Sequence, residues 1–371
     1  MQSAFVAADA VAAGTSHNAP IKKHRRITRI HRRYRLDRIH ATHDVVTRPQ
    51  PAIVAPVLRP LVRLLTLLAE RATVFLPMAL LLGLLLQDLA ATLKPLVTPL
   101  AIVLLGIAMA RTDWPAFAAV LRRPWLGLAT IVAAMIAVPL LAAPLLRLMP
   151  IAEGLALALA LMACLPPLTS MAAMAGFLGL DRAHALFAVL VGTALAPLTI
   201  PPLALALFGL DLKMGFWAFM GRLAGIVAAG FVLALALRWL SRGREAKAAP
   251  LIDGALIVSL LVFAIPIMDG VTARILAEPW RTGGFVLWSF IATFAYMAVV
   301  TLVFWPLVGK QLACTAGYAA GSRNNALLLA ALPASVDPDY FLFIAAVQFP
   351  IYLIPTIMQP IYRRLLRPAP G

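Results

Sequence analysis

A run of four polar residues, Ser322-Arg323-Asn324-Asn325, interrupts an apolar segment that extends from residue 312 to residue 332. A charged side chain in the middle of a bilayer costs roughly 3 to more than 10 kcal/mol, so such residues normally face protein or water and mark a pathway or a binding site. An arginine also offers a cationic hydrogen-bond donor, which suits an anionic ligand. The run is therefore the first candidate site for a ligand or an ion.

A second candidate site lies at residues 164–170, where Pro166 and Pro167 are followed by Thr169 and Ser170. Tandem prolines remove two backbone donors and kink or open a helix. At such a break the two hydroxyls could bind an ion or a substrate. Alternatively, each hydroxyl bonds back to a carbonyl of its own helix.

The composition sets the class of protein that positions these residues. Hydrophobic residues make up 62% of the 371 residues and charged residues 13%, which is more apolar surface than a soluble globule can bury. We therefore expect an all-α integral membrane protein, with ten apolar stretches long enough to cross about 30 Å of hydrocarbon. They are residues 65–87, 95–110, 125–149, 153–177, 183–208, 214–240, 251–270, 284–308, 312–332 and 340–366.

Basic residues are distributed unevenly between the loops of these ten helices. If the N-terminus is cytoplasmic, twelve lysines and arginines fall in the short inner loops and the C-terminal tail, whereas five fall in the outer loops. The positive-inside rule then predicts that both termini are cytoplasmic, in a multi-pass protein of the plasma (inner) membrane.

The ten helices divide into two sets of five, and the fourth and ninth helices share an upstream cysteine and a break near the middle. The breaks are expected at residues 164–170 and 317–325. Because five is an odd number, the second set is inverted relative to the first. Paired interruptions in inverted halves indicate the binding site of a secondary transporter. Cys164 and Cys314 lie on different helices, so we expect buried free thiols.

Residues 1–60 form a basic segment ahead of a membrane domain at 61–371, whose two repeats span about 61–210 and 211–366. We expect a disordered cytoplasmic arm that rests on anionic lipid, where each basic side chain near the surface contributes about 1 kcal/mol. An Arg-rich organelle presequence is an alternative. Nucleic-acid binding is disfavoured, because the arm has no fold signature for it.

The residues from Pro99 to Thr112, with Phe117, the run 121–124 and the two broken helices, resemble the bile acid:sodium symporter family, within the superfamily of bile acid, arsenite and auxin carriers. The resemblance covers most of residues 61–366. It implies a core domain of helices 3–5 and 8–10, a panel domain of helices 1, 2, 6 and 7, and crossed, broken helices 4 and 9.

The sequence departs from this family where the resemblance places its sodium ligands. Cys164 and Ser170 match the helix 4 motif, but Met171 replaces an asparagine, His184 and Ala188 replace hydroxyl residues, Ala319 replaces a carboxylate and Arg323 replaces a glutamine. A positive charge about 5 Å from a sodium site opposes sodium binding by roughly 3 kcal/mol at an effective dielectric constant near 20. We therefore expect sodium coupling to be weak or absent.

Arg323 has two interpretations, because the interiors of helices 4, 5, 8, 9 and 10 contain no carboxylate. Carbonyls freed by the breaks, with Asn324 and Asn325, could satisfy its charge. Alternatively, Arg323 could replace the sodium ion and present a cationic donor to an anionic substrate. His184 could couple transport to protons, since histidine changes charge near neutral pH, or simply lie at the membrane interface. Gln348 in helix 10 is a weaker candidate site residue.

These observations favour a secondary transporter of a small or amphipathic organic anion that works without a cofactor, with sodium or a proton as the possible coupling ion. A sodium-coupled symporter of the bile acid type and a non-transporting membrane sensor or scaffold are the alternatives. An intramembrane enzyme is disfavoured, because the sequence has no His-Glu-x-x-His motif, no Gly-x-Ser-x-Gly motif and no intramembrane acid pair. Nothing in the sequence indicates an oligomeric state.

Overall fold

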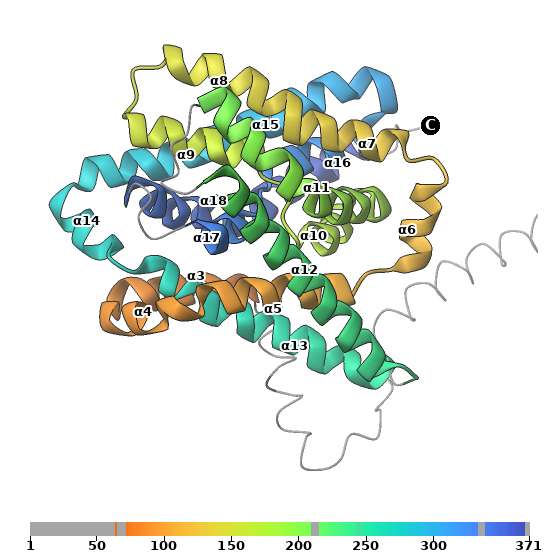
Figure 1. Cartoon of the computed structure of the whole chain (residues 1–371). Coiled ribbons are helices and arrows are strands. Elements are labelled where there is room, and N and C mark those ends of the chain that lie inside the picture. Colours follow the sequence, from red (N-terminus) through yellow and green to blue (C-terminus); the bar gives the residue numbers. More distant parts are fainter. Residues whose placement is uncertain (1–63, 65–71, 209–214, 244, 333–337, 368–371) are drawn as a thin grey trace, which may run out of the picture. The chain divides into compact units, whose positions relative to one another are not determined.

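The computed structural model describes residues 64, 72–208, 215–243, 245–332 and 338–367. The basic arm at 1–60 and residues 65–71 of the first expected span lie outside the described residues. The described part is helical (Figure 1). It contains seven helices long and apolar enough to cross a membrane. They are Gln87–Ala110, Trp125–Leu148, Arg182–Leu207, Phe216–Ser241, Leu251–Met268, Pro279–Val308 and Pro338–Leu365.

The first elements along the chain are α3 (Ala72–Leu85), α4 (Gln87–Leu93), η2 (Lys94–Leu96), α5 (Val97–Ala110), α6 (Trp114–Leu121), α7 (Trp125–Val132), η3 (Ala133–Ala137) and α8 (Val138–Leu148). Next come α9 (Glu153–Cys164), α10 (Met171–Leu178), α11 (Arg182–Phe208), α12 (Phe216–Ser241), α13 (Glu245–Ala264) and η4 (Pro266–Met268). The last are α14 (Val271–Ala277), α15 (Pro279–Val308), α16 (Lys310–Gly321), α17 (Asn325–Ala331) and α18 (Pro338–Leu365).

Two of the expected spans are each built from two short helices. Helices α9 and α10 make the fourth span, and α16 and α17 make the ninth. Between α9 and α10, Pro166 and Pro167 cannot donate the backbone hydrogen bonds that would continue the helix. Between α16 and α17, only residues 322–324 are non-helical. The sequence predicts a wider second break that starts at residue 317, but Gly317 lies inside α16.

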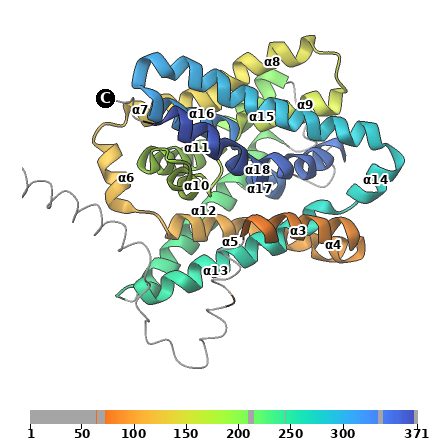
Figure 2. The same ribbon diagram turned by 180° about the vertical axis from the view of Figure 1, so that it is seen from behind.

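The glycines of α16 allow it to pack closely against α15 (Figure 2). A Cβ atom at Gly321 would lie 2.7 Å from the Thr293 carbonyl oxygen and 2.9 Å from Met297 Sδ, and a Cβ atom at Gly317 would lie 2.6 Å from the Met297 carbonyl oxygen. Small residues spaced four apart permit this close approach of backbones in membrane helices. Gly317 and Gly321 are therefore packing residues, which is why the second break is narrower than predicted.

A separate group of helices contains α3, α5, α12 and α13. Helix α5 packs along α12 and α13, and α13 packs along α3 (Figures 1 and 2). A Cβ atom at Gly106 of α5 would lie 2.8 Å from Leu233 Cδ2 of α12, so these two helices also pack closely. Arg111 Nε forms an ion pair with Asp253 Oδ1 over 2.7 Å and joins α5 to α13. Helix α17 packs against α5 and α12, which connects this group to the second break.

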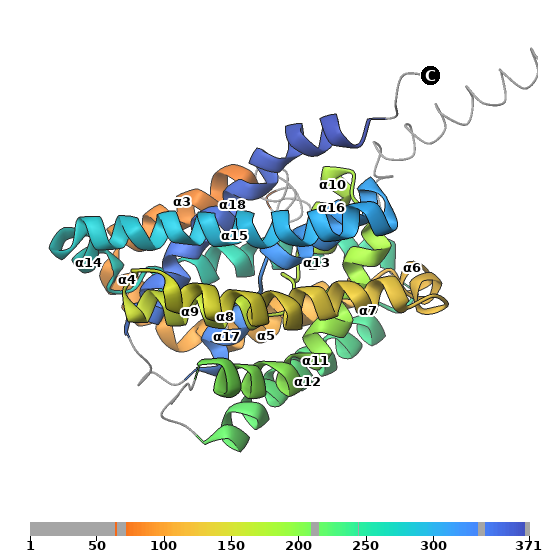
Figure 3. The same ribbon diagram turned by 90° about the horizontal axis from the view of Figure 1, so that it is seen from above.

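The third expected span is continuous from α7 through α8 (Figure 3). It contains a five-residue π-helical turn, Ala133–Ala137, in which the Val138 N–H donates to the Ala133 carbonyl five residues back. The sequence does not predict this turn. π turns inside α-helices are rare and often occur at functional sites.

Candidate functional site

The two breaks lie against each other and pair as an isolated antiparallel bridge. The Leu168 N–H donates to the Ser322 carbonyl, and the Asn324 N–H donates to the Pro166 carbonyl, both over 2.9 Å. A membrane interior offers no water to backbone groups that a helix break leaves unpaired. Each break therefore supplies partners that the other needs, and the two are brought together at one point of the fold.

Arg323 lies in this bridge with its side chain 0% exposed. Its Nη1 donates to the Leu165 carbonyl over 2.6 Å, and its Nη2 donates to the Ala134 carbonyl of the π turn over 2.7 Å. Its Nε has no hydrogen-bond partner among the described residues. Hydrogen bonds from a charged group contribute about 1.5–3 kcal/mol each. Arg323 is thus paired with two carbonyl oxygens, and the carbonyl of Ala134 lies outside both breaks.

The two asparagines that follow Arg323 are buried, and their side chains bond to the backbone. Asn324 Oδ1 accepts from the Leu327 N–H over 3.3 Å and caps α17. Asn325 Nδ2 donates to the Arg323 carbonyl over 3.2 Å, whereas its Oδ1 has no partner in the described part of the chain. Ser322 is 6% exposed. Nearly all buried polar atoms in proteins are paired, so Asn325 Oδ1 and Arg323 Nε are exceptions among the described residues.

Thr169 and Ser170 lie at the same crossing, at the beginning of α10, and both are half-buried. Neither hydroxyl bonds to another of the residues that the structure describes, so the back-bonding alternative is not formed here. Gln348 is buried on α18, and its Nε2 donates to the Ile344 carbonyl of its own helix over 3.2 Å. The two hydroxyls are therefore free to contact a ligand, and Gln348 is held to its helix.

His184 does not join the crossing. Its Nδ1 lies 3.2 Å from Asp181 Oδ1, and its backbone N–H donates to the same oxygen over 2.9 Å. The Asp181 N–H donates to Thr315 Oγ1 over 3.0 Å, which places the pair beside α16 about 10 Å of helix before Ser322. The His184 side chain beside the Asp181 carboxylate is the main reason that the pKa of Asp181 lies below its usual value.

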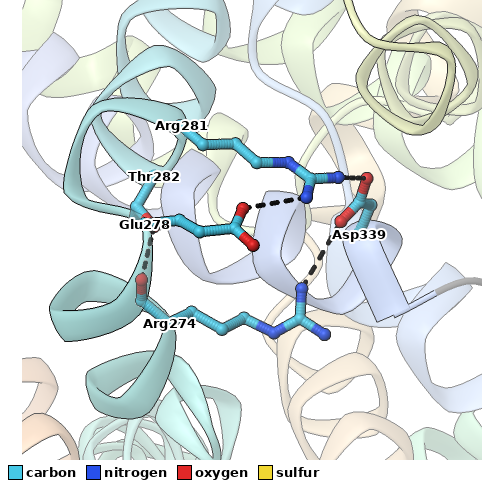
Figure 4. Close-up of polar contacts among 5 residues, drawn as sticks. All are labelled: Arg274, Glu278, Arg281, Thr282 and Asp339. Carbon is cyan, nitrogen blue, oxygen red and sulfur yellow. Dashed lines mark hydrogen bonds and ion pairs between the residues drawn. The ribbon is translucent and has the colours of Figure 1, made fainter.

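The four half-helices that meet at the crossing bring no carboxylate to it. Helices α9, α10, α16 and α17 as described contain a single acidic residue, Glu153, in the first turn of α9 at the opposite end from the break. A carboxylate cluster lies elsewhere, at the beginning of α18 (Figure 4). There Asp339 pairs with Arg281 Nη2 over 2.5 Å and with Arg274 Nη1 over 3.4 Å, and Glu278 pairs with Arg281 Nη1 over 2.9 Å. Within the described ranges, Arg323 therefore has no acidic partner.

Sequence reasoning missed the contribution of the π turn to the site. The group that binds Arg323 there is the carbonyl of Ala134, and a carbonyl carries no signal in the sequence because every residue has one. Pro139, five residues later, is the signal that could have drawn attention to it. Cys164 and Cys314 are buried free thiols, as the sequence predicts.

No protein-family model matches this chain, and no curated protein matches it. The function is therefore inferred from the geometry of the crossing. That geometry offers a fixed cation, two free hydroxyls, an unpaired amide oxygen and the ends of four half-helices. The half-buried hydroxyls of Thr169 and Ser170 can donate hydrogen bonds to a polar ligand, but no nucleophile among the described residues of the crossing is paired with a general base.

Proposed function

We propose that this protein is a secondary transporter that moves a small or amphipathic organic anion across the plasma membrane by alternating access. In this proposal it has ten spans in two inverted repeats and cytoplasmic termini, like the bile acid:sodium symporter family that its sequence resembles. The observation that carries the proposal is the direct pairing of two broken helices around a fully buried arginine. Broken helices that meet inside the membrane are typical of transporter binding sites.

The helix ends at the crossing support an anionic substrate. Helices α9 and α16 end there and α10 and α17 begin there, so two negative and two positive ends of helix dipoles meet. Arg323 donates to the Leu165 carbonyl at the end of α9 and offsets one of the negative ends. The two positive helix ends then outweigh the one negative end that Arg323 does not offset, and this balance favours an anion over a cation. Thr169 and Ser170 stand at the positive end of α10, where they can donate hydrogen bonds to a carboxylate.

The same charge argues against sodium as the coupling ion. At about 5 Å and an effective dielectric constant near 20, Arg323 would oppose a sodium ion by roughly 3 kcal/mol, or about a hundredfold in affinity. No carboxylate on the four described half-helices lies at the crossing to compensate for this repulsion. We therefore expect transport that does not depend on sodium.

Thermal-shift screening of the purified protein against organic acids, in sodium and in choline buffers, tests the proposal. A carboxylate that raises the unfolding temperature equally in both buffers supports sodium-independent anion binding. Stabilisation that requires sodium would instead favour a sodium-coupled symporter. Uptake of the same acid into proteoliposomes should be unchanged when choline replaces sodium, and a complete lack of uptake would contradict transport.

Deletion of residues 1–50 separates a transporter from a sensor or scaffold that uses the basic arm. A transporter should keep the uptake rate of the full chain, because the crossing lies entirely between residues 134 and 327. A scaffold would show no uptake in either form and would lose a bound partner on deletion. The full-length chain in the same vesicles is the control.

A further inference from the structure

The carbonyl of Ala134 is open to Arg323 because its two ordinary donors are missing. In an α-helix this carbonyl would accept from the Val138 N–H, but in the π turn Val138 donates to Ala133 instead. In the π register the next donor would come from residue 139, which is a proline and has no N–H. The carbonyl therefore lacks a partner within its own helix, and Arg323 Nη2 donates to it over 2.7 Å.

We propose that Pro139 is a positioning residue for Arg323, and that the span Trp125–Leu148 forms a third wall of the site beside the two broken helices. Pro139 is buried and, in this proposal, acts through the backbone of its own helix. The proposal that Pro139 positions Arg323 does not depend on whether the protein is a transporter. Its consequence for an anionic substrate rests on the proposed function.

A second contact links the π turn to the first break. Gly192 of α11 lies between them, since a Cβ atom there would be 3.1 Å from Pro167 Cδ, 3.6 Å from Pro166 Cβ and 3.3 Å from Met135 Sδ. Met135 follows Ala134 directly and is 0% exposed. A change of register in the π turn would therefore move the carbonyl that binds the arginine together with a side chain packed beside the first break.

A double-mutant cycle in the full-length protein tests this role. Pro139→Ala introduces an N–H that can donate to the Ala134 carbonyl and compete with Arg323. Pro144→Ala is the matched control, because Pro144 lies inside the same helix, α8, but has an exposed side chain. Each is combined with Arg323→Gln, and the unfolding temperature is measured for the single and double variants. Pro139→Val, which also has an N–H, replaces Pro139→Ala if the latter does not fold.

We expect Arg323→Gln to lower the unfolding temperature less in the Pro139→Ala background than in the wild-type background, because the arginine has already lost one of its two carbonyl partners. The same substitution should have its full effect in the Pro144→Ala background, since independent sites are additive. Additive effects with both prolines would overturn the proposal.

Chemical rescue provides a readout that a merely structural proline would not change. Millimolar guanidinium should partly restore the unfolding temperature of Arg323→Ala by binding the vacated Leu165 and Ala134 carbonyls. It should fail to do so in Arg323→Ala combined with Pro139→Ala, and equal rescue in both would contradict the role of Pro139. If Pro139→Ala and Arg323→Gln are coupled but the protein shows no uptake, the transport proposal is refuted and the positioning role stands. If the protein shows uptake but the two substitutions have additive effects, the positioning role is refuted and the transport proposal stands.

Discussion

Replacement of Arg323 by glutamine should weaken anion binding without preventing folding. The guanidinium is 0% exposed and both terminal nitrogens bind carbonyls, so its charge should act on a substrate through intervening protein rather than by contact. At a separation of about 7 Å and an effective dielectric constant near 20, this attraction is about 2.4 kcal/mol, or roughly fiftyfold in affinity. The neutral amide of glutamine loses the attraction but keeps an N–H donor for one of the carbonyls.

Two further substitutions separate the charge from the hydrogen bonds. Arg323→Lys keeps the charge, so substrate affinity should fall only a few-fold. Arg323→Met has neither charge nor donors and leaves the Leu165 and Ala134 carbonyls unpaired, at about 1–3 kcal/mol each. It should therefore lower the unfolding temperature more than Arg323→Gln, although both variants are neutral. Arg222→Gln on α12 is the control, because this membrane-span arginine has an exposed side chain.

The measurements are the dissociation constant in detergent and the KM for uptake into proteoliposomes, for the organic acid identified by thermal shift. An Arg323→Gln variant with the wild-type KM would show that the charge does not reach the substrate, and would remove the electrostatic reason to expect an anion. If Arg323→Lys lost as much affinity as Arg323→Gln, the two-carbonyl geometry rather than the charge would be decisive.

Three other predictions concern packing and charge. Gly321→Ala should destabilise the protein by about 1–3 kcal/mol, because its Cβ would overlap α15, whereas Gly225→Ala, with no atom within 4 Å of its Cβ, should change the unfolding temperature little. Asp339→Asn should cost about 1–2 kcal/mol, because Arg274 loses the carboxylate it contacts and Arg281 keeps only Glu278, and an unchanged midpoint in thermal unfolding would contradict this. His184 lowers the pKa of Asp181 below the usual value of 3.8. The ionised Asp181 carboxylate should therefore contribute its full stabilisation near neutral pH, and this stabilisation should be lost as the pH falls below 3.8 and through the lowered pKa. The stability difference between wild type and Asp181→Asn should therefore shrink in acid, and a difference independent of pH would refute the assignment.

The first break could be predicted because proline acts on its own backbone. Pro166 and Pro167 end α9 whatever tertiary contacts the helix makes. In the structure the break spans residues 165–170. The buried thiols of Cys164 and Cys314 follow in the same way from the apolar segments around them. The seven described membrane-length helices follow from composition and length. The ten-helix inverted repeat remains a prediction, because the first expected span begins outside the described residues.

The second break and the partners of Arg323 depend on contacts that the sequence does not contain. A glycine in an apolar segment is equally consistent with a break and with close packing, and the neighbouring α15 decides in favour of packing at Gly317 and Gly321. Ala134 lies 189 residues before Arg323 in the chain, and the two meet only in the folded protein. The π turn that makes its carbonyl free has no distinctive residue except Pro139.

The bridge between the breaks limits how the proposed transporter can move. Two backbone hydrogen bonds and the contact from Arg323 to Leu165 join the two broken helices, and separating them would leave these polar groups unpaired inside the membrane, at several kcal/mol per group. The contact between α17 and α5 costs less to break, since it consists of apolar packing and the hydrogen bond from Thr98 Oγ1 to the Ala330 carbonyl over 3.3 Å. Alternating access should therefore slide α17 along α5 and α12 while the crossing itself stays intact. A transporter of this kind would carry its site as a unit, with the fixed charge of Arg323 travelling beside the substrate.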